Sequence, residues 1–254
     1  LDDIIIVDAR GEDEAKKGTV KGAVATTWQY LATCEDGEAG DANWGCILDT
    51  KRLSERLGEL GLAKDKEIVL FSNAEKGWGE DGRIAWELIA AGYEDVKIVD
   101  GGIKALKAAG VETVKGAAEP KPVSVEIDSI DETHVINTDE LKEIYDCKIV
   151  DTRTDKEYNG KTMYGEENGG HLPGAIQIRY TDLFNSDSTL KSNEDLTKMF
   201  EDAGLSKEDH IITYCTGGIR SAYMQLVMEM CGFENSENYD ESFYRWCVEG
   251  DLEK

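Results

Sequence analysis

The sequence is poor in the residues that usually build metal and disulfide sites. It has 3 histidines, 3 prolines and 6 cysteines among 254 residues, and no two cysteines form a C-x-x-C pair. So few histidines argue against a histidine-based metal site, and we expect no metal. Six cysteines are too sparse for a disulfide scaffold, although one or two bridges would be compatible with an exported protein. The apolar runs at 4–7 and 68–71 suit buried strands and fall far below the ~20 residues of a membrane helix.

Positive charge is scarce as well. The chain has 28 Lys and Arg against 53 Asp and Glu, which gives a formal net charge of −25. Such a surface repels phosphate backbones and anionic lipids, so we expect neither a nucleic-acid nor a membrane partner. Hydrophobic residues make up 40% of the chain, which is enough to build a core and excludes disorder along its whole length.

The chain begins with Leu1 and two aspartates, which lead directly into a predicted strand. Neither a Met nor a basic and apolar secretory leader comes first. We expect a cytoplasmic protein whose natural start has been removed. The alternative is an exported protein whose leader was removed before Leu1.

The sequence repeats itself. The segment VDAR at 7–10 recurs as VDTR at 150–153, and GLAKDKEIVLFS at 61–72 recurs as GLSKEDHIITYC at 204–215. Both pairs are 143 residues apart (150 − 7 and 204 − 61). Between these blocks the spacing grows to 152, which predicts about nine extra residues in the second copy, within 159–170. Matching blocks in one order indicate two homologous domains.

The boundary between the copies is placed at a segment with two prolines, KGAAEPKP at 115–122. Proline disfavours helix and lacks a backbone donor, so this stretch is typical of a linker. We therefore predict a first domain over 1–116, a linker over 117–123 and a second domain over 124–254.

Each copy alternates short apolar strands with amphipathic helices. This order predicts an α/β fold, with a mainly parallel sheet covered by helices on both faces. In the second copy the strands are expected at 148–151, 174–178, 211–214 and 236–239, and the helices at 193–203 and 220–230. Sites in such sheets form at the carboxyl ends of the strands, where loops lead into helices.

The second copy carries a cysteine at such a place. Cys215 follows the strand at 211–214, and Gly217 and Gly218 allow a ligand to approach the backbone closely. Backbone N–H groups in a tight loop at a helix start form a nest for an anion. A free thiol with a pKa of ~8.5 is only a few per cent ionised at pH 7, and this setting would favour the thiolate. The sequence therefore predicts a reactive cysteine.

The same position in the first copy is Ser72, in a longer loop without a thiol. A lone cysteine after a buried strand is more often a small core residue. The two glycines, the nearby Arg220 and the strand-loop-helix setting favour the reactive alternative for Cys215. One copy is thus expected to be active and the other inactive.

Four stretches of the chain together resemble the rhodanese family of sulfurtransferases in its tandem form. They are VDTRTDKEY at 150–158, GGHLPGAIQI at 169–178, YCTGGIRSA at 214–222 and NYDESFYRW at 238–246. The last stands where the family has Y-D-G-S-W-x-x-W. The resemblance covers nearly the whole chain. It implies two rhodanese-like domains, of which the first is inactive and the second is catalytic.

The resemblance also implies a reaction in two displacements. Cys215 would take a sulfane sulfur from an anionic donor, hold it as a persulfide and pass it to a thiophilic acceptor such as cyanide, a thiol or a protein cysteine. Neither a metal nor an organic cofactor is expected. Loop N–H groups would stabilise the added negative charge. The expected substrate-binding residues are Thr216, Gly217, Gly218, Ile219, Arg220 and Arg179.

Loop length bears on the choice between two related chemistries. Cysteine-based phosphatases use C-x5-R, whereas Arg220 stands five positions after Cys215 and closes a smaller C-x4-R loop. This favours a sulfur-sized group over a tetrahedral phosphate. Thiosulfate is the favoured donor, and 3-mercaptopyruvate is also possible. A non-enzymatic sulfur carrier or interaction module stays open as the alternative, with a phosphatase or arsenate reductase behind it.

Several other polar residues have a structural alternative. Arg220 either attracts the donor or fixes the loop by pairing with a carboxylate. Arg179 could bind an anionic group of the donor or lie at the surface. Asp151, Arg153 and Glu157 are expected to form a structural network below the strand end, as their counterparts do in the first copy.

His171 is expected to fix a turn rather than to act as a base. Cys34 and Cys46 flank an acidic loop and could form a bridge or a weak calcium site, but their spacing is not that of an EF-hand. The remaining cysteines are interpreted as core thiols: Cys147, Cys231 and Cys247.

Overall fold

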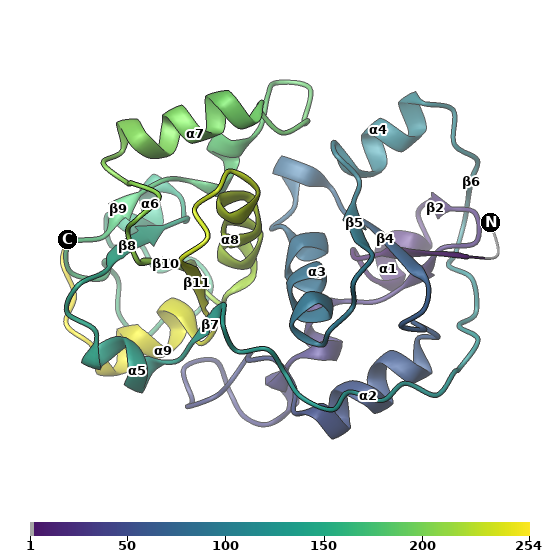
Figure 1. Ribbon diagram of the computed structural model, residues 1–254, viewed down its shortest axis with the longest axis horizontal. Coiled ribbons are helices and arrows are strands. Elements are labelled where there is room, and N and C mark those ends of the chain that lie inside the picture. Colours follow the sequence, from purple (N-terminus) through teal and green to yellow (C-terminus); the bar gives the residue numbers. More distant parts are fainter. Residues whose placement is uncertain (1–2) are drawn as a thin grey trace. The chain divides into compact units, whose positions relative to one another are not determined.

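The computed structural model describes residues 3–254, which group into two compact units (Figure 1). Unit 1 contains the described residues up to Leu31, together with Ile47–Asp131 and Ser186–Leu190. Unit 2 contains Ala32–Cys46, Glu132–Asn185 and Lys191–Lys254. Each unit therefore includes one short segment from the other half of the sequence. The predicted boundaries at 116 and 124 stay a prediction about the repeat.

Unit 1 is built on a parallel sheet of four strands in the order β3-β1-β4-β5. The strands are β1 (Ile4–Asp8), β3 (Val24–Ala25), β4 (Glu67–Phe71) and β5 (Val96–Ile98). A separate antiparallel pair joins β2 (Thr19–Val20) to β6 (Thr113–Val114). The helices are α1 (Glu12–Ala15), α2 (Thr50–Glu59), α3 (Glu80–Ala90) and α4 (Gly102–Ala108).

Unit 2 is built on a parallel sheet of five strands in the order β7-β11-β10-β8-β9. The strands are β7 (Val135–Ile136), β8 (Lys148–Asp151), β9 (Ile176–Gln177), β10 (Ile211–Tyr214) and β11 (Ser236–Tyr239). The helices are α5 (Thr138–Glu143), α6 (Asp155–Tyr158), α7 (Asn193–Asp202), α8 (Ile219–Met230) and α9 (Ser242–Glu249).

The two sheets have the same strand order once the repeat is taken into account. The series β3-β1-β4-β5 in unit 1 corresponds to β9-β8-β10-β11 in unit 2, and β7 is added at the edge. The predicted α/β fold with two parallel sheets is confirmed. The predicted helix at 193–203 is confirmed as α7, where the Ser192 hydroxyl accepts the N–H of Asp195 at 3.1 Å. Gly204 ends that helix with a φ of +90°.

The central strand of unit 2 is covered on both faces. All four residues of β10 are buried, because helices pack on either side of it. On one face Ile212 and Tyr214 join a core with Leu141 of α5 and with Phe243 and Trp246 of α9. On the other face α8 packs against β10 and β11. Within unit 2, Figure 1 shows α5 and α9 together on one side of these strands and α7 on the other.

A segment from the first half of the sequence completes unit 2. The backbone N–H of Asn43 donates to a Glu241 carboxylate oxygen at 2.6 Å, and Arg245 donates to the carbonyl of Gly40 at 3.0 Å. The ring of Trp44 meets that of Tyr244 edge-on, with centroids 5.4 Å apart. The segment Ala32–Cys46 is thereby attached to α9, a long-range pairing that the repeat does not reveal.

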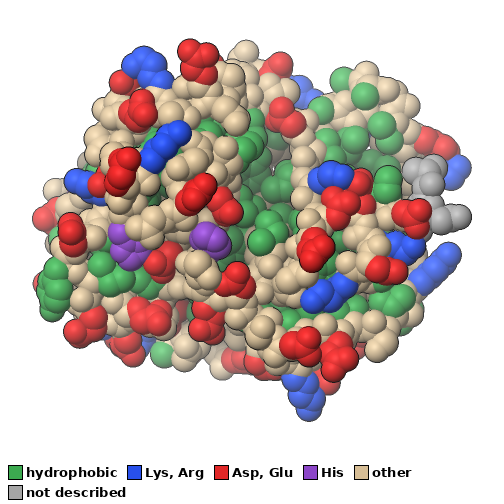
Figure 2. All heavy atoms as spheres, in the orientation of Figure 1, with side chains coloured by type: hydrophobic (Ala, Val, Ile, Leu, Met, Phe, Trp, Pro, Cys, Tyr) green, Lys and Arg blue, Asp and Glu red, His purple; other side chains and the backbone are tan. Residues whose placement is uncertain are grey.

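The surface reflects the composition. Asp and Glu side chains are spread over the visible faces of both units, with fewer Lys and Arg between them (Figure 2). Among residues 3–254, no helix is long and apolar enough to cross a membrane.

Candidate active site

The predicted reactive cysteine lies at the carboxyl end of the central strand of unit 2. Cys215 follows β10 directly, and α8 begins four residues later at Ile219. Gly218 precedes that helix with a φ of +83°, a left-handed conformation in which a side chain would be strained. The side chain of Cys215 is buried, with 1% of its surface exposed.

Polar groups surround the buried sulfur. Burial raises the pKa of the Cys215 thiol, but the charge of Arg220 and hydrogen bonds from the N–H groups of Ser221 and Gly217 lower it further than burial raises it. The net result is a thiol pKa below its ordinary value. A thiol with these neighbours favours the thiolate, which is the nucleophilic form. The stabilising amides are thus those of Gly217, within the expected loop, and of Ser221, one residue beyond it.

Arg220 pairs with a carboxylate. Its guanidinium donates to both oxygens of Glu157 at 2.8 and 3.1 Å, and to the Thr216 hydroxyl at 2.9 Å. The Thr216 hydroxyl in turn donates to Glu157 at 2.8 Å. Of the two roles expected for Arg220, this geometry favours fixing the loop, because both carboxylate oxygens are already engaged by its fork.

Glu157 is itself held firmly. It is fully buried on α6, and its Oε2 accepts the backbone N–H of Thr154 at 3.0 Å and the Thr154 hydroxyl at 2.7 Å. Burial alone would raise the pKa of Glu157. The hydrogen bonds and charge of Arg220, together with Thr154, instead lower that pKa to about 2. Helix α6 therefore supplies a permanent negative partner for Arg220, and the turn before it holds that carboxylate in place through Thr154.

The start of α9 holds the other side of the loop. Ser242 accepts the Cys215 N–H at 2.9 Å, and the Phe243 and Tyr244 N–H groups donate to the carbonyls of Cys215 and Thr216 at 3.1 and 2.9 Å. Ser242 has a φ of +56°, where non-glycine residues are strained. The sequence analysis did not select Ser242 or Tyr244. Their signal was the NYDESFYRW stretch, which was used only to recognise the family.

Asp151 and Arg153 form a structural pair below the loop. Arg153 binds the Asp151 carboxylate at 2.7 Å and the carbonyl of Gly170 at 2.7 Å, and its guanidinium lies 3.8 Å from the Phe243 ring centroid. In unit 1, Asp8 and Arg10 form the same pair at 2.7 Å. The structural role predicted for these two positions is confirmed.

Glu157 has the structural role expected of it, but its hydrogen bonds go to Arg220, Thr216 and Thr154 rather than to Asp151 or Arg153. Its counterpart Glu14 pairs with Lys17 at the surface of unit 1, whereas Glu157 is buried against Arg220. The two residues occupy matching sequence positions. Their environments differ because unit 1 has no arginine at the place of Arg220.

Two further residues singled out in the sequence lie in local contacts. Arg179, with 43% of its side chain exposed, pairs with Asp182 at 2.8 Å and with Asp155 at 3.1 Å. His171 stacks on Tyr158 with ring centroids 3.7 Å apart, and its Nδ1 lies 2.9 Å from the Tyr158 carbonyl oxygen. These contacts fit the turn-fixing role expected for His171.

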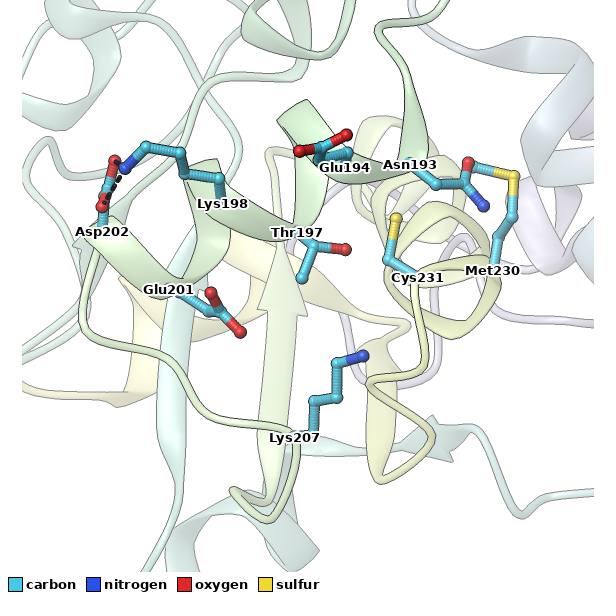
Figure 3. A pocket seen from close by; sticks show the side chains of 9 residues that line it. All are labelled: Asn193, Glu194, Thr197, Lys198, Glu201, Asp202, Lys207, Met230 and Cys231. Carbon is cyan, nitrogen blue, oxygen red and sulfur yellow. Dashed lines mark hydrogen bonds and ion pairs between the residues drawn. The ribbon is translucent and has the colours of Figure 1, made fainter.

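The six cysteines are all free thiols, so the bridge considered for Cys34 and Cys46 is not formed in the structure. Cys147 is partly buried and packs against the hydrophobic core of unit 2, while Cys231 and Cys247 are buried, as expected of core thiols. Cys231 lies on a cavity of about 570 Å³ at the end of α8, facing Thr197 and Lys207 (Figure 3). Burial raises the pKa of Cys231, which distinguishes it from Cys215. Within residues 3–254, no three His, Cys, Asp or Glu side chains are grouped to hold a metal ion.

A family model for the rhodanese-like domain matches the chain twice, over residues 1–109 and 137–249. The chain belongs to the rhodanese family. Both matches fall on the halves of the repeat, so the tandem arrangement expected from the motifs is confirmed.

Rhodanese relatives share a moderate part of the sequence. A protein of Mycolicibacterium smegmatis named "Putative thiosulfate sulfurtransferase" is 29% identical over 244 residues, which cover 92% of this chain and 84% of the relative. The sulfur carrier protein TtuD of Thermus thermophilus is 26% identical over 214 residues, covering 79% of this chain and 74% of the relative.

Solved structures share the fold. The anaerobic ergothioneine biosynthesis enzyme from Chlorobium limicola superimposes with a TM-score of 0.87 at 21% identity. The alignment covers 99% of this chain but only 64% of that enzyme, so the chain spans less than two thirds of its length. The likeness shows that the two proteins share the tandem rhodanese fold.

Proposed function

We propose that this protein is a sulfurtransferase that moves a sulfane sulfur from an anionic donor to a thiophilic acceptor through a persulfide on Cys215. The observation that carries the proposal is the position of Cys215 between β10 and the start of α8, where the charge of Arg220 and the amides of Gly217 and Ser221 lower its thiol pKa. The family membership of the chain supports the same chemistry. Thiosulfate is the favoured donor, and 3-mercaptopyruvate is the second.

The first displacement loads the enzyme. The Cys215 thiolate attacks the outer sulfur of thiosulfate, and a new S–S bond forms to Cys215 Sγ. The bond between the two thiosulfate sulfurs breaks, and its electron pair leaves with sulfite. The terminal sulfur of the persulfide carries the negative charge, which N–H groups of the loop stabilise.

The second displacement unloads the enzyme. Cyanide or a thiolate attacks the terminal sulfur of the persulfide, and the bond to Cys215 Sγ breaks. The electron pair of that bond returns to Cys215 as a thiolate, so the enzyme is regenerated. Dividing one transfer into two in this way is covalent catalysis and needs no external oxidant.

The residues around Cys215 have supporting roles in this scheme. The positive charge of Arg220 stabilises the Cys215 thiolate, and its ion pair with Glu157 fixes the conformation of the loop. Ser242 orients the Cys215 amide. The loop residues Thr216, Gly217, Gly218 and Ile219 form the cradle. Arg179 is proposed to attract the anionic donor, in competition with its two carboxylate partners.

The test is thiocyanate formation from thiosulfate and cyanide. Cys215→Ser should abolish turnover and sulfur loading, whereas Cys147→Ser, which changes a partly buried thiol elsewhere, should keep both. Turnover that survives Cys215→Ser would overturn the proposal. Parallel assays with 3-mercaptopyruvate decide between the two donors.

A sulfur carrier is the second candidate, because one relative bears that name at 26% identity. A carrier would form the Cys215 persulfide and yet release it only to a protein cysteine. Loading without turnover of cyanide or small thiols would favour this candidate. Fast turnover with cyanide would favour the enzyme.

A further inference from the structure

A buried glutamate lies in the part of the chain that the second copy adds. Glu166 belongs to the stretch between α6 and β9, and only 6% of its surface is exposed. Its Oε2 accepts the backbone N–H groups of Met163 and Tyr164, each at 2.8 Å. Its Oε1 is buried and has no hydrogen-bond partner among the described residues. One oxygen of the carboxylate therefore stabilises a turn, and the other is left without a donor.

This carboxylate lies close to the Cys215 loop. The Tyr244 hydroxyl donates to the carbonyl of Tyr164 at 2.9 Å, next to the amide that Glu166 binds. The Tyr244 ring packs on Gly217, where an added Cβ would lie 3.3 Å from ring carbons. Burial raises the pKa of Tyr244 to about 12, and the charges of Glu166 and Cys215 are the next causes. One tyrosine is thus within electrostatic reach of both groups.

A buried carboxylate oxygen without a donor is unfavourable, because desolvation is not repaid by a hydrogen bond. The buried guanidinium of Arg220 does not supply the donor, since it is bound to Glu157 and Thr216. An ammonium group on a ligand would satisfy Glu166 Oε1 and would form a charge-assisted bond.

We propose that Glu166 is a specificity-determining residue that recognises the ammonium group of a small thiol acceptor at the Cys215 site. The inference rests on the sulfurtransferase function proposed above, and it names the class of acceptor. In the unloading step the acceptor thiolate attacks the terminal sulfur of the Cys215 persulfide anion, and the bond between that sulfur and Cys215 Sγ breaks. The acceptor leaves as its own persulfide anion, and the electron pair of the broken bond returns to Cys215 as a thiolate.

The experiment compares two probes that differ in one charge. Cysteamine carries an ammonium group, and N-acetylcysteamine has the same skeleton without the charge. The enzyme is loaded with thiosulfate, the persulfide is verified by mass spectrometry, and unloading is followed with each thiol. We expect kcat/KM, expressed per thiolate, to be at least about tenfold higher for cysteamine, the factor typical of one charged hydrogen bond.

The matched variants are Glu166→Gln and Glu167→Gln. Glu167 is an exposed neighbour, so its replacement removes the same charge from the surface. Glu166→Gln should bring the cysteamine preference close to one, and its amide keeps an oxygen for the turn. Glu167→Gln should leave the preference unchanged. A merely structural Glu166 would alter both probes equally.

The outcomes distinguish a failure of the proposed sulfurtransferase function from a failure of the role proposed for Glu166. If Cys215 takes no sulfur from thiosulfate or 3-mercaptopyruvate, the proposed function fails and this inference fails with it. If the enzyme loads but wild type shows no preference for cysteamine, only this inference is overturned, and that result does not depend on the folding of any variant. A preference that persists in a folded Glu166→Gln variant would overturn it as well.

Discussion

The turns after the central strands of the two units share one backbone arrangement and differ in their charges. In unit 1 the N–H of Ile103 donates to the carbonyl of Ser72 at 2.9 Å, and in unit 2 the N–H of Phe243 donates to that of Cys215 at 3.1 Å. The residues before these donors, Gly102 and Ser242, have φ angles of +57° and +56°. Ser72 and Cys215 are therefore equivalent in space within their own units.

The charges at these equivalent turns are opposite. The second residue of α3 is Asp81, and the second residue of α8 is Arg220. Burial raises the pKa of Asp81 to about 7. Unit 1 thus holds an acid beside its turn, where unit 2 holds a cation. The same backbone supports an anion only where its neighbours favour negative charge.

Moving the thiol from the turn of unit 2 to the equivalent turn of unit 1 tests the difference between the two turns most severely. A Ser72→Cys, Cys215→Ser double variant keeps one thiol at an equivalent backbone position, but it places that thiol beside Asp81 instead of Arg220. We expect sulfur transfer at least about 1000-fold below wild type, because the nucleophile is removed from its stabilising charge. The assay is thiocyanate formation, with persulfide mass as a second readout. Recovered turnover would show that the backbone alone is sufficient.

The next largest effect is expected from the partner of Arg220. Glu157→Gln leaves a buried guanidinium without its counter-ion, which typically costs about 3–5 kcal/mol of unfolding free energy. Glu14→Gln, at the matching position in unit 1, removes only an exposed pair with Lys17 and should cost about 0–1 kcal/mol. Chemical denaturation measures both. Equal losses would contradict the difference between the two environments.

Glu157 also predicts an acid-labile contribution to stability. Its folded pKa of about 2 lies below the ordinary value of 4.5, so the unfolded chain binds the proton more tightly. The stabilisation is present above about pH 4.5 and is lost as the pH falls towards 2, by about 3 kcal/mol in total. Denaturation curves across this range should show the loss in wild type. In the Glu157→Gln variant, the unfolding free energy should lack this part of its dependence on pH.

Asp81 predicts a pH dependence of the opposite sign. Its folded pKa of about 7 lies above the ordinary value of 3.8, so the folded chain binds the proton more tightly. Stability from this carboxyl is fully present below about pH 4 and falls as the pH rises through 7, by up to about 4 kcal/mol. Asp81→Asn should therefore raise the melting temperature at pH 8 and change it little at pH 4. A variant that is less stable at pH 8 would contradict this.

The smallest effect is expected at Ser242. In unit 1 a Cβ on Gly102 would lie 2.3 Å from the Ser72 carbonyl oxygen, whereas unit 2 accommodates a serine that accepts the Cys215 N–H. Ser242→Gly relieves the backbone strain and removes that hydrogen bond. Stability should change by less than about 1 kcal/mol, while persulfide formation should slow about fivefold, the effect of one hydrogen bond. An unchanged loading rate would exclude a role for Ser242 in placing Cys215.

Much of the fold could be predicted because its signals are local. The strand before Cys215, the helix after it and the Ser192 cap depend on neighbours in the sequence, and the repeat then gave the second sheet from the first. The segments Ala32–Cys46 and Ser186–Leu190 could not be predicted, since each joins the unit formed mainly by the other half. Their anchoring bonds, such as that between Asn43 and Glu241, connect residues far apart in the chain.

The sequence predicted the cysteine loop of the site, but not the residues from other segments that surround the loop. Cys215 and its glycines stand in one continuous loop, so a single stretch of sequence contains them. The partner of Arg220 is Glu157, 63 positions earlier, and no spacing rule distinguishes it from the other acidic residues of this chain. The bond from the Cys215 N–H to Ser242 and the unpaired buried oxygen of Glu166 become visible only once the chain is folded.

The most direct measurement of the central claim is the thiol pKa of Cys215. Labelling with iodoacetamide across a range of pH, followed by mass spectrometry of the peptide that contains Cys215, gives that value in the intact protein. The account predicts half-maximal labelling below the ~8.5 of a free cysteine. A value at or above that of a free cysteine would show that burial outweighs Arg220 and the loop amides, and would contradict the account.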